Sequence, residues 1–234
     1  MIRVFREAFS LLFSGDAEVY FLAFVTLRFA TFSVLISAVF SVPIGLLLAF
    51  GAFPGRKPIT VLISGAMAIP TVVIGLFVFS LFSRSGVFKQ STILFTPTAV
   101  ILGQALFAAP VIVSLTVSGL SRIDHRFSET MFTLSFGHRR RYLYIVREGT
   151  DEIFHALLTS YGRVVGEVGI SMMLGGNIRW YTRTLTTSIM LETGKGNFTR
   201  ALALGIILLV IAVVINSALL LAAAYAGQDR YVRA

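Results

Sequence analysis

Residues 201–226 read ALALGIILLVIAVVINSALLLAAAYA, a run without one charged residue. About 20 apolar residues in a helix cross the roughly 30 Å hydrocarbon core of a bilayer. A run of this length and composition therefore predicts a membrane-spanning helix. Similar apolar runs recur along the chain and predict about five transmembrane helices in all, at about 22–50, 59–82, 98–120, 153–174 and 201–226.

The composition of the whole chain agrees with this reading. Of its 234 residues, 56% are hydrophobic and only 13% are charged, and the mean hydropathy is +0.85. Soluble domains average about 45–50% apolar and about 25% charged residues. The composition therefore excludes a soluble globular enzyme and a disordered chain, and the expected fold class is an all-α polytopic membrane protein.

The net charge of +9 would suggest nucleic-acid binding in a soluble protein. In a membrane protein, basic loops set the orientation, because cytoplasmic loops carry an excess of Lys and Arg. The run Arg139-Arg140-Arg141 favours a cytoplasmic location for the charged segment 121–152. The chain has no cysteine, which excludes disulfides and thiolate metal sites.

The expected organisation is a single membrane domain with short appendages. Residues 1–18 predict an amphipathic helix that lies in the membrane interface, and Asp16 is expected to cap the helix that follows. Residues 19–226 form the transmembrane domain, with the helical loop at about 121–152 outside the lipid, and 227–234 form a short cytoplasmic tail. Residues 175–200 are expected to form a Thr-rich loop.

Catalytic motifs are missing from the sequence. There is no Walker sequence, no G-x-S-x-G and no H-E-x-x-H. His125, His138 and His155 lack the spacing of metal ligands and are expected to be solvated loop residues. The sequence therefore predicts neither an enzyme nor a metal site.

Three charged residues fall within the expected spans: Arg28, Arg163 and Glu167. A charge at a helix centre costs roughly 2.5–3.5 kcal/mol on insertion scales, so such residues are functional candidates. Arg163 and Glu167 are four residues apart and could pair on one helix face, either as a structural ion pair or as part of a substrate pathway. Arg28 could extend its side chain to the outer interface.

A second candidate pathway segment begins at Gly175-Gly176-Asn177. Consecutive glycines expose backbone N–H groups that can form an anion-binding concavity. Four threonines and two arginines follow and add hydroxyl donors and positive charge: Thr182, Thr184, Thr186, Thr187, Arg179 and Arg183. A structural helix end is the alternative reading. The candidate pathway or gate residues are Arg163, Glu167, Gly175, Gly176, Asn177, Thr182 and Arg183.

The charged segment contains ETMFTLSFG at 129–137, followed by Tyr142 and Ile145-Val146. This pattern resembles the cytoplasmic EAA loop of ABC importer permeases of the type I (MetI-like) fold. Thr130 and Met131 stand where the family has alanines, and Gly137 lies two positions late. The resemblance implies that a partner ATPase contacts this loop, and it assigns the coupling role to Glu129, Leu134, Ser135, Gly137 and Tyr142.

Residues 161–196 read YGRVVGEVGISMMLGGNIRWYTRTLTTSIMLETGKG and resemble the tungstate-type permeases of oxyanion importers. The resemblance implies a homodimeric membrane subunit without catalytic activity. Its partners would be a cytoplasmic ATPase that holds ATP and Mg²⁺ and an extracytoplasmic binding protein that delivers the anion. The expected function is therefore oxyanion import, with tungstate first and molybdate or sulfate as alternatives.

The sequence leaves two other function classes open. A proton-coupled carrier would use Glu167 and Arg163, although the chain lacks the repeated halves common in such carriers. A membrane scaffold without transport activity would show no dependence on anions or on an ATPase.

Overall fold

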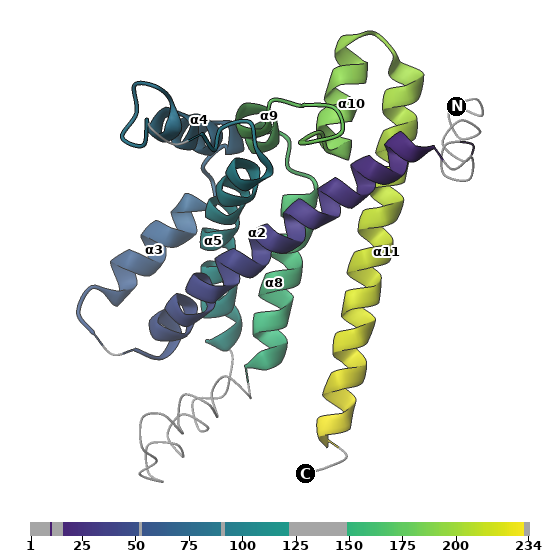
Figure 1. Ribbon diagram of the computed structural model, residues 1–234. Coiled ribbons are helices and arrows are strands. Elements are labelled where there is room, and N and C mark those ends of the chain that lie inside the picture. The colour runs from purple at the N-terminus through teal and green to yellow at the C-terminus, as the bar shows by residue number, and fades with distance from the viewer. Residues whose placement is uncertain (1–9, 11–15, 52, 90–91, 122–148, 232–234) are drawn as a thin grey trace.

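The computed structural model describes residues 10, 16–51, 53–89, 92–121 and 149–231 (Figure 1). Its secondary structure over these residues is helical, as the composition predicts. The helices are α2 (Ala17–Phe50), α3 (Arg56–Ala66), α4 (Thr71–Phe82), α5 (Pro97–Leu120), α8 (Thr150–Val165), α9 (Gly169–Gly175), α10 (Leu185–Gly194) and α11 (Phe198–Tyr231). Most of the expected interfacial helix 1–18 and of the loop 121–152 lies outside the described residues.

Among the described residues, three helices are long and apolar enough to cross a membrane: α2, α5 and the part Phe198–Ala218 of α11. The Asp16 carboxylate accepts a hydrogen bond of 2.8 Å from the Glu18 N–H, which confirms Asp16 as the cap of α2. α11 extends through Tyr231, five residues beyond the expected end of the last span.

The expected second span, 59–82, is divided between α3 and α4. The two helices together are apolar enough to cross, but they are bent by 98° at their break, as in a broken span or a re-entrant loop. Pro70 lies at this break with an extended backbone, φ −60° and ψ 135°. Proline has no N–H to continue α3 and suits the start of a helix, so the break falls here.

The expected continuous span at 153–174 is wrong, because α8 ends at Val165 and α9 begins at Gly169. α8 has 16 residues and is about 24 Å long, short of the roughly 30 Å hydrocarbon core. Gly166 ends α8. The apolar character of 153–174 is consistent with either arrangement, so hydropathy alone missed this break.

The ends of the helices lie at two opposite ends of the molecule (Figure 1). The start of α2, α9, α10 and the α10–α11 turn lie at one end, which we call the α9 end. The α2–α3 turn, the end of α5, the start of α8 and the end of α11 lie at the other. Because residues 122–148 connect α5 to α8, we call the second end the loop end.

The main core lies between α2, α5, α8 and α9. Phe29 of α2, Ile112 of α5 and Leu174 of α9 are each at most 1% exposed. Gly103 allows α5 and α9 to approach closely, since an added Cβ would lie 2.5 Å from Leu174 Cδ1. The short helix α9 therefore packs against α5 at a position where a larger residue would force Leu174 or Ile170 to shift.

Candidate functional site

The candidate pathway segment forms a compact turn between α9 and α10. Gly175 is the last residue of α9, and Gly176 follows in the left-handed conformation with φ +67°. The Thr182 hydroxyl donates to the Gly175 carbonyl at 2.5 Å and accepts the Ile178 N–H at 3.0 Å. The structure thus brings Gly175 and Thr182 together, and the Thr182 hydroxyl is used to close the turn.

Asn177 and Arg183 are also brought together. Asn177 has a positive φ of 52°, and the Arg183 Nε donates to Asn177 Oδ1 at 3.1 Å. Arg183 Nη2 donates to the Asn177 carbonyl oxygen at 3.2 Å. The guanidinium therefore binds the carbonyl side of the turn, which leaves less of its hydrogen-bonding capacity for an anion.

The threonines that follow are buried and bonded to one another or to the backbone. Thr184 caps α10, and its hydroxyl accepts the Thr187 N–H at 3.2 Å while the Thr187 hydroxyl accepts the Thr184 N–H at 2.9 Å. The Thr186 hydroxyl donates to the Glu167 carbonyl at 2.9 Å. The segment expected to be a Thr-rich loop is thus a capped helix, and these hydroxyls support the fold of this end.

Glu167 is 5% exposed and caps α9. Its carboxylate accepts the Ile170 N–H at 2.7 Å, the Ser171 N–H at 3.1 Å and the Ser171 hydroxyl at 3.1 Å. These N–H groups belong to the first turn of a helix and have no partner within it. The observed bonds indicate that Glu167 fixes the position of α9 in the bundle.

Arg163 does not pair with Glu167 in the structure. α8 ends between the two residues, so the four-residue spacing no longer places them on one helix face. Arg163 is exposed, and its guanidinium carbon lies 5.4 Å from the centre of the Phe107 ring of α5. The candidate residues therefore divide into the α9–α10 turn, the Glu167 cap and a separate Arg163–Phe107 contact.

A buried polar chain extends from Glu167 into two spans. The Ser171 hydroxyl accepts Gln104 Nε2 at 3.1 Å, and the Ser33 hydroxyl donates to Gln104 Oε1 at 3.1 Å. Gln104 is 3% exposed. The sequence reasoning missed Gln104, although an amide in the middle of an apolar span was a usable signal.

A cluster of charges ties the start of α2 to the α9 end. Arg179 binds the Glu18 carboxylate through two hydrogen bonds of 3.2 and 2.8 Å. Arg183 and Arg200 each place a guanidinium nitrogen 3.5 Å from the same carboxylate. One carboxylate thus forms ion pairs with three guanidinium groups. The cluster therefore has an excess of positive charge. The sequence alone could not predict this role of Glu18, because its partners are distant in sequence.

The expected coupling residues, Glu129, Leu134, Ser135, Gly137 and Tyr142, lie outside the described residues. The helices that flank them in sequence are described: α5 ends at Leu120 and α8 begins at Thr150, both at the loop end (Figure 1). Arg56 and Lys57 at the start of α3 lie at this end also. Among the described residues, no group of three His, Cys, Asp or Glu side chains could hold a metal ion.

Related proteins cover most of this chain. A probable anion ABC transporter permease protein from Haloferax volcanii is 38% identical over 87% of this chain and 91% of its own. The tungstate uptake system permease protein TupB of Peptoclostridium acidaminophilum is 34% identical over 91% and 93%. The sulfate transport system permease protein CysT of Salmonella typhimurium is 26% identical over 79% and 69%.

The fold agrees with that of a solved transporter structure. The chain matches a structure titled as an inward facing conformation of the MetNI methionine ABC transporter with a TM-score of 0.66 and 19% identity, over 92% of this chain and 93% of that one. Residues 41–226 match the family described as binding-protein-dependent transport system inner membrane component. The chain therefore belongs to this family of multi-pass inner-membrane transport components.

Proposed function

We propose that this chain is the membrane-spanning subunit of an ATP-driven importer for a tetrahedral oxyanion, with tungstate as its substrate. The observation that carries the proposal is the 34% identity to a tungstate uptake permease over 91% of this chain. The identity to the sulfate permease is lower, at 26%, and extends over less of the chain. The tungstate reading is preferred to sulfate for this reason.

The proposed assembly contains two copies of this chain, two copies of a cytoplasmic ATPase and an extracytoplasmic binding protein. ATP and Mg²⁺ would bind to the ATPase subunits. The loop around Glu129 would contact them, and it connects to the bundle through α5 and α8. Movement of the loop would thereby reach Gln104 on α5, which is hydrogen-bonded to α9.

The carrier alternative, which would need Glu167 to take up and release protons, has less support. The Glu167 carboxylate accepts three hydrogen bonds from α9. Protonation would weaken the bonds that hold the helix, because a carboxyl group accepts less well than a carboxylate. The bonding pattern supports a positioning role for Glu167.

Transport by the purified, reconstituted complex tests the proposal. Proteoliposomes would contain the permease and its ATPase with ATP and Mg²⁺ on the ATPase side, and tungstate-loaded binding protein on the other. We expect tungstate accumulation that requires both ATP and the binding protein. Accumulation driven by a pH gradient without ATP would contradict the proposal, as would ATP-driven accumulation of sulfate but not tungstate.

A further inference from the structure

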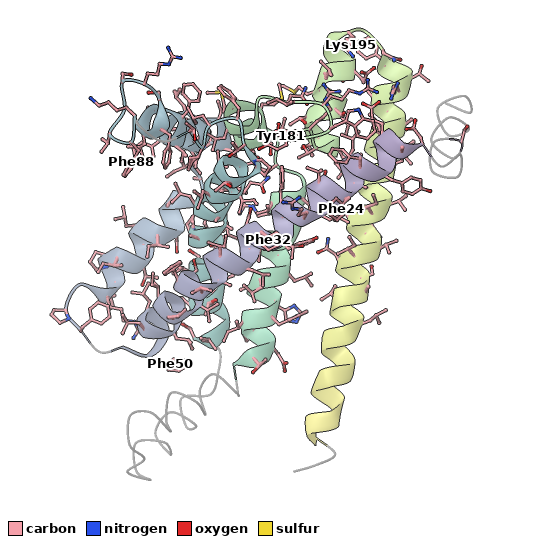
Figure 2. All side chains as sticks on the ribbon, in the orientation of Figure 1. Phe24, Phe32, Phe50, Phe88, Tyr181 and Lys195 are labelled. Carbon is pink, nitrogen blue, oxygen red and sulfur yellow. The ribbon has the colours of Figure 1, made fainter. Side chains whose placement is uncertain are left out.

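An open groove of about 640 Å³ lies beside α2 near the α9 end, and its lining includes one of the charged candidates named from the sequence, Arg28. Its lining includes Arg28 of α2, Thr98 of α5, Thr92 of the segment before α5, and Tyr181 of the α9–α10 turn. Tyr181 and Arg28 line the same groove, and Figure 2 shows the labelled Tyr181 toward the α9 end of the molecule.

Arg28 is the one charged residue that the structure describes in this lining. The side chain is exposed, and the ion pairs of the described residues all involve other cations. Thr92, Thr98 and Tyr181 are exposed also. The groove therefore combines one guanidinium and three accessible hydroxyl groups, without a carboxylate in the described lining to neutralise the charge.

The position of Arg28 along α2 places the groove on one side of the molecule. α2 runs from Ala17 at the α9 end to Phe50 at the loop end (Figure 1), and Arg28 lies in the half of the helix nearer the α9 end. With the basic α2–α3 turn on the cytoplasmic side, in keeping with the charge rule, the groove lies toward the outer side.

We propose that Arg28, Thr92, Thr98 and Tyr181 form an outer contact site for a tetrahedral oxyanion before it crosses the membrane. The identity of the anion as tungstate rests on the proposed function. A guanidinium presents a planar fork of N–H donors that matches two oxygens of such an anion, and hydroxyl groups can donate to the others. An exposed site of this kind binds an anion weakly. Weak binding suits transport, because a transported ion must also leave the site.

The chain has no cysteine, so a Thr98→Cys variant carries a single thiol inside the groove. The thiol is modified in the assembled transporter with a pair of methanethiosulfonate reagents, one bearing a sulfonate and the other a quaternary ammonium group. The ratio of the two rates reports the local charge, because any effect on thiol reactivity cancels. Thr92→Cys offers a second position if the first variant does not assemble.

We expect the sulfonate-to-ammonium rate ratio to fall about fivefold when Arg28→Gln is added, as for the loss of one unit charge about 8 Å away in water. The matched control is Arg84→Gln, since Arg84 is an exposed arginine that does not line the groove. This control should leave the ratio unchanged. An unchanged ratio in Arg28→Gln, or a thiol that neither reagent reaches, would overturn the site.

Tungstate is the second probe. It should slow modification by the neutral reagent methyl methanethiosulfonate more than chloride does at equal ionic strength, and Arg28→Gln should abolish this protection. Equal effects of tungstate and chloride would overturn the site. These readouts need no transport, so an Arg28-dependent ratio in a complex that fails to import tungstate would contradict the proposed function while the site stands.

Discussion

Gln104 Nε2 donates a hydrogen bond of 3.1 Å to the Ser171 hydroxyl, and this buried contact joins the span α5 to the short helix α9. Ser171 donates in turn to Glu167, so the amide of α5 is bonded to the cap of α9. The other side of Gln104 accepts from Ser33 of α2. One side chain thus fixes the mutual position of three helices.

Replacing Gln104 by leucine is expected to destabilise the complex modestly. In this variant the Ser33 hydroxyl keeps its hydrogen bond to the Phe29 carbonyl, and the Ser171 hydroxyl keeps its hydrogen bond to the Glu167 carboxylate. Neither hydroxyl therefore loses every partner. Side-chain hydrogen bonds between membrane helices average about 0.6 kcal/mol, with a maximum of about 1.7. Thermal unfolding of the purified complex in detergent measures the loss. A destabilisation of several kcal/mol would indicate that Gln104 has a larger role than these two bonds.

Glu167→Gln and Glu167→Ala separate a positioning role from a proton-carrying role. Glutamine keeps one acceptor oxygen for the first turn of α9, whereas alanine leaves buried donors unpaired at about 1–3 kcal/mol. We expect Glu167→Gln to retain most ATP-driven uptake and Glu167→Ala to lose most of it, together with thermal stability. Equal loss of uptake in two stably folded variants would instead indicate that the ionisable group itself is required.

Gly103→Ala tests the close approach of α5 and α9. The new methyl group would lie 2.5 Å from Leu174 Cδ1 and 2.6 Å from Ile170 Cγ2, and such overpacking costs about 1–3 kcal/mol. Gly205→Ala in α11 is the matched control, because nothing lies within 4 Å of its added Cβ. A lower unfolding temperature is expected for Gly103→Ala alone, so equal unfolding temperatures for both variants would contradict the packing.

The α10–α11 turn should open as the pH falls. Lys195 Nζ donates to the Glu192 carboxylate at 2.9 Å, and this bond lowers the pKa of Glu192 below its ordinary 4.5. A lowered pKa means that the stabilisation is complete above 4.5 and is lost as the pH falls through the pKa of the folded protein.

Hydrogen exchange of the amides at 194–197 measures this opening after correction for the intrinsic pH dependence of exchange. We expect protection to fall at acidic pH in the unaltered chain. Glu192→Gln should show weaker protection that no longer changes in this pH range. Protection that changes identically in both proteins would exclude Glu192 as its source.

Glu129→Lys tests the coupling role that the resemblance assigns to the loop. The reversed charge would repel a basic partner on the ATPase, and a lysine has no acceptor for an amide N–H. We expect loss of tungstate uptake and loss of ATPase stimulation, with a normal amount of permease in the membrane. Normal uptake by this variant would remove Glu129 from the coupling contact.

The sequence supported the fold class and the three unbroken spans, because long apolar runs in lipid leave helices as the stable structure. It did not show the break at 166–168, since hydropathy does not distinguish one continuous helix from two helices joined by a short turn. The α10 helix was missed because its cap is formed by Thr184 and Thr187, whereas the recognised capping pattern has Glu or Gln at the second position.

The structure brings only some of the candidate pathway residues together. Asn177 and Arg183, six residues apart, meet because the turn closes locally. Arg163 and Glu167 do not pair, since their spacing assumed one helix. The Glu18 cluster and the Arg28 groove each join segments more than 60 residues apart in sequence. No local pattern predicts such contacts, which depend on how the helices pack.

The most direct test of the central claim is purification of this chain from native membranes, with identification of the bound proteins and an ATPase assay. We predict a copurifying ATPase whose activity rises when tungstate-loaded binding protein is added, and does not rise with the unloaded protein. Purification of the intact chain without any ATPase would contradict the importer, and an ATPase stimulated only by another oxyanion would contradict tungstate as the substrate.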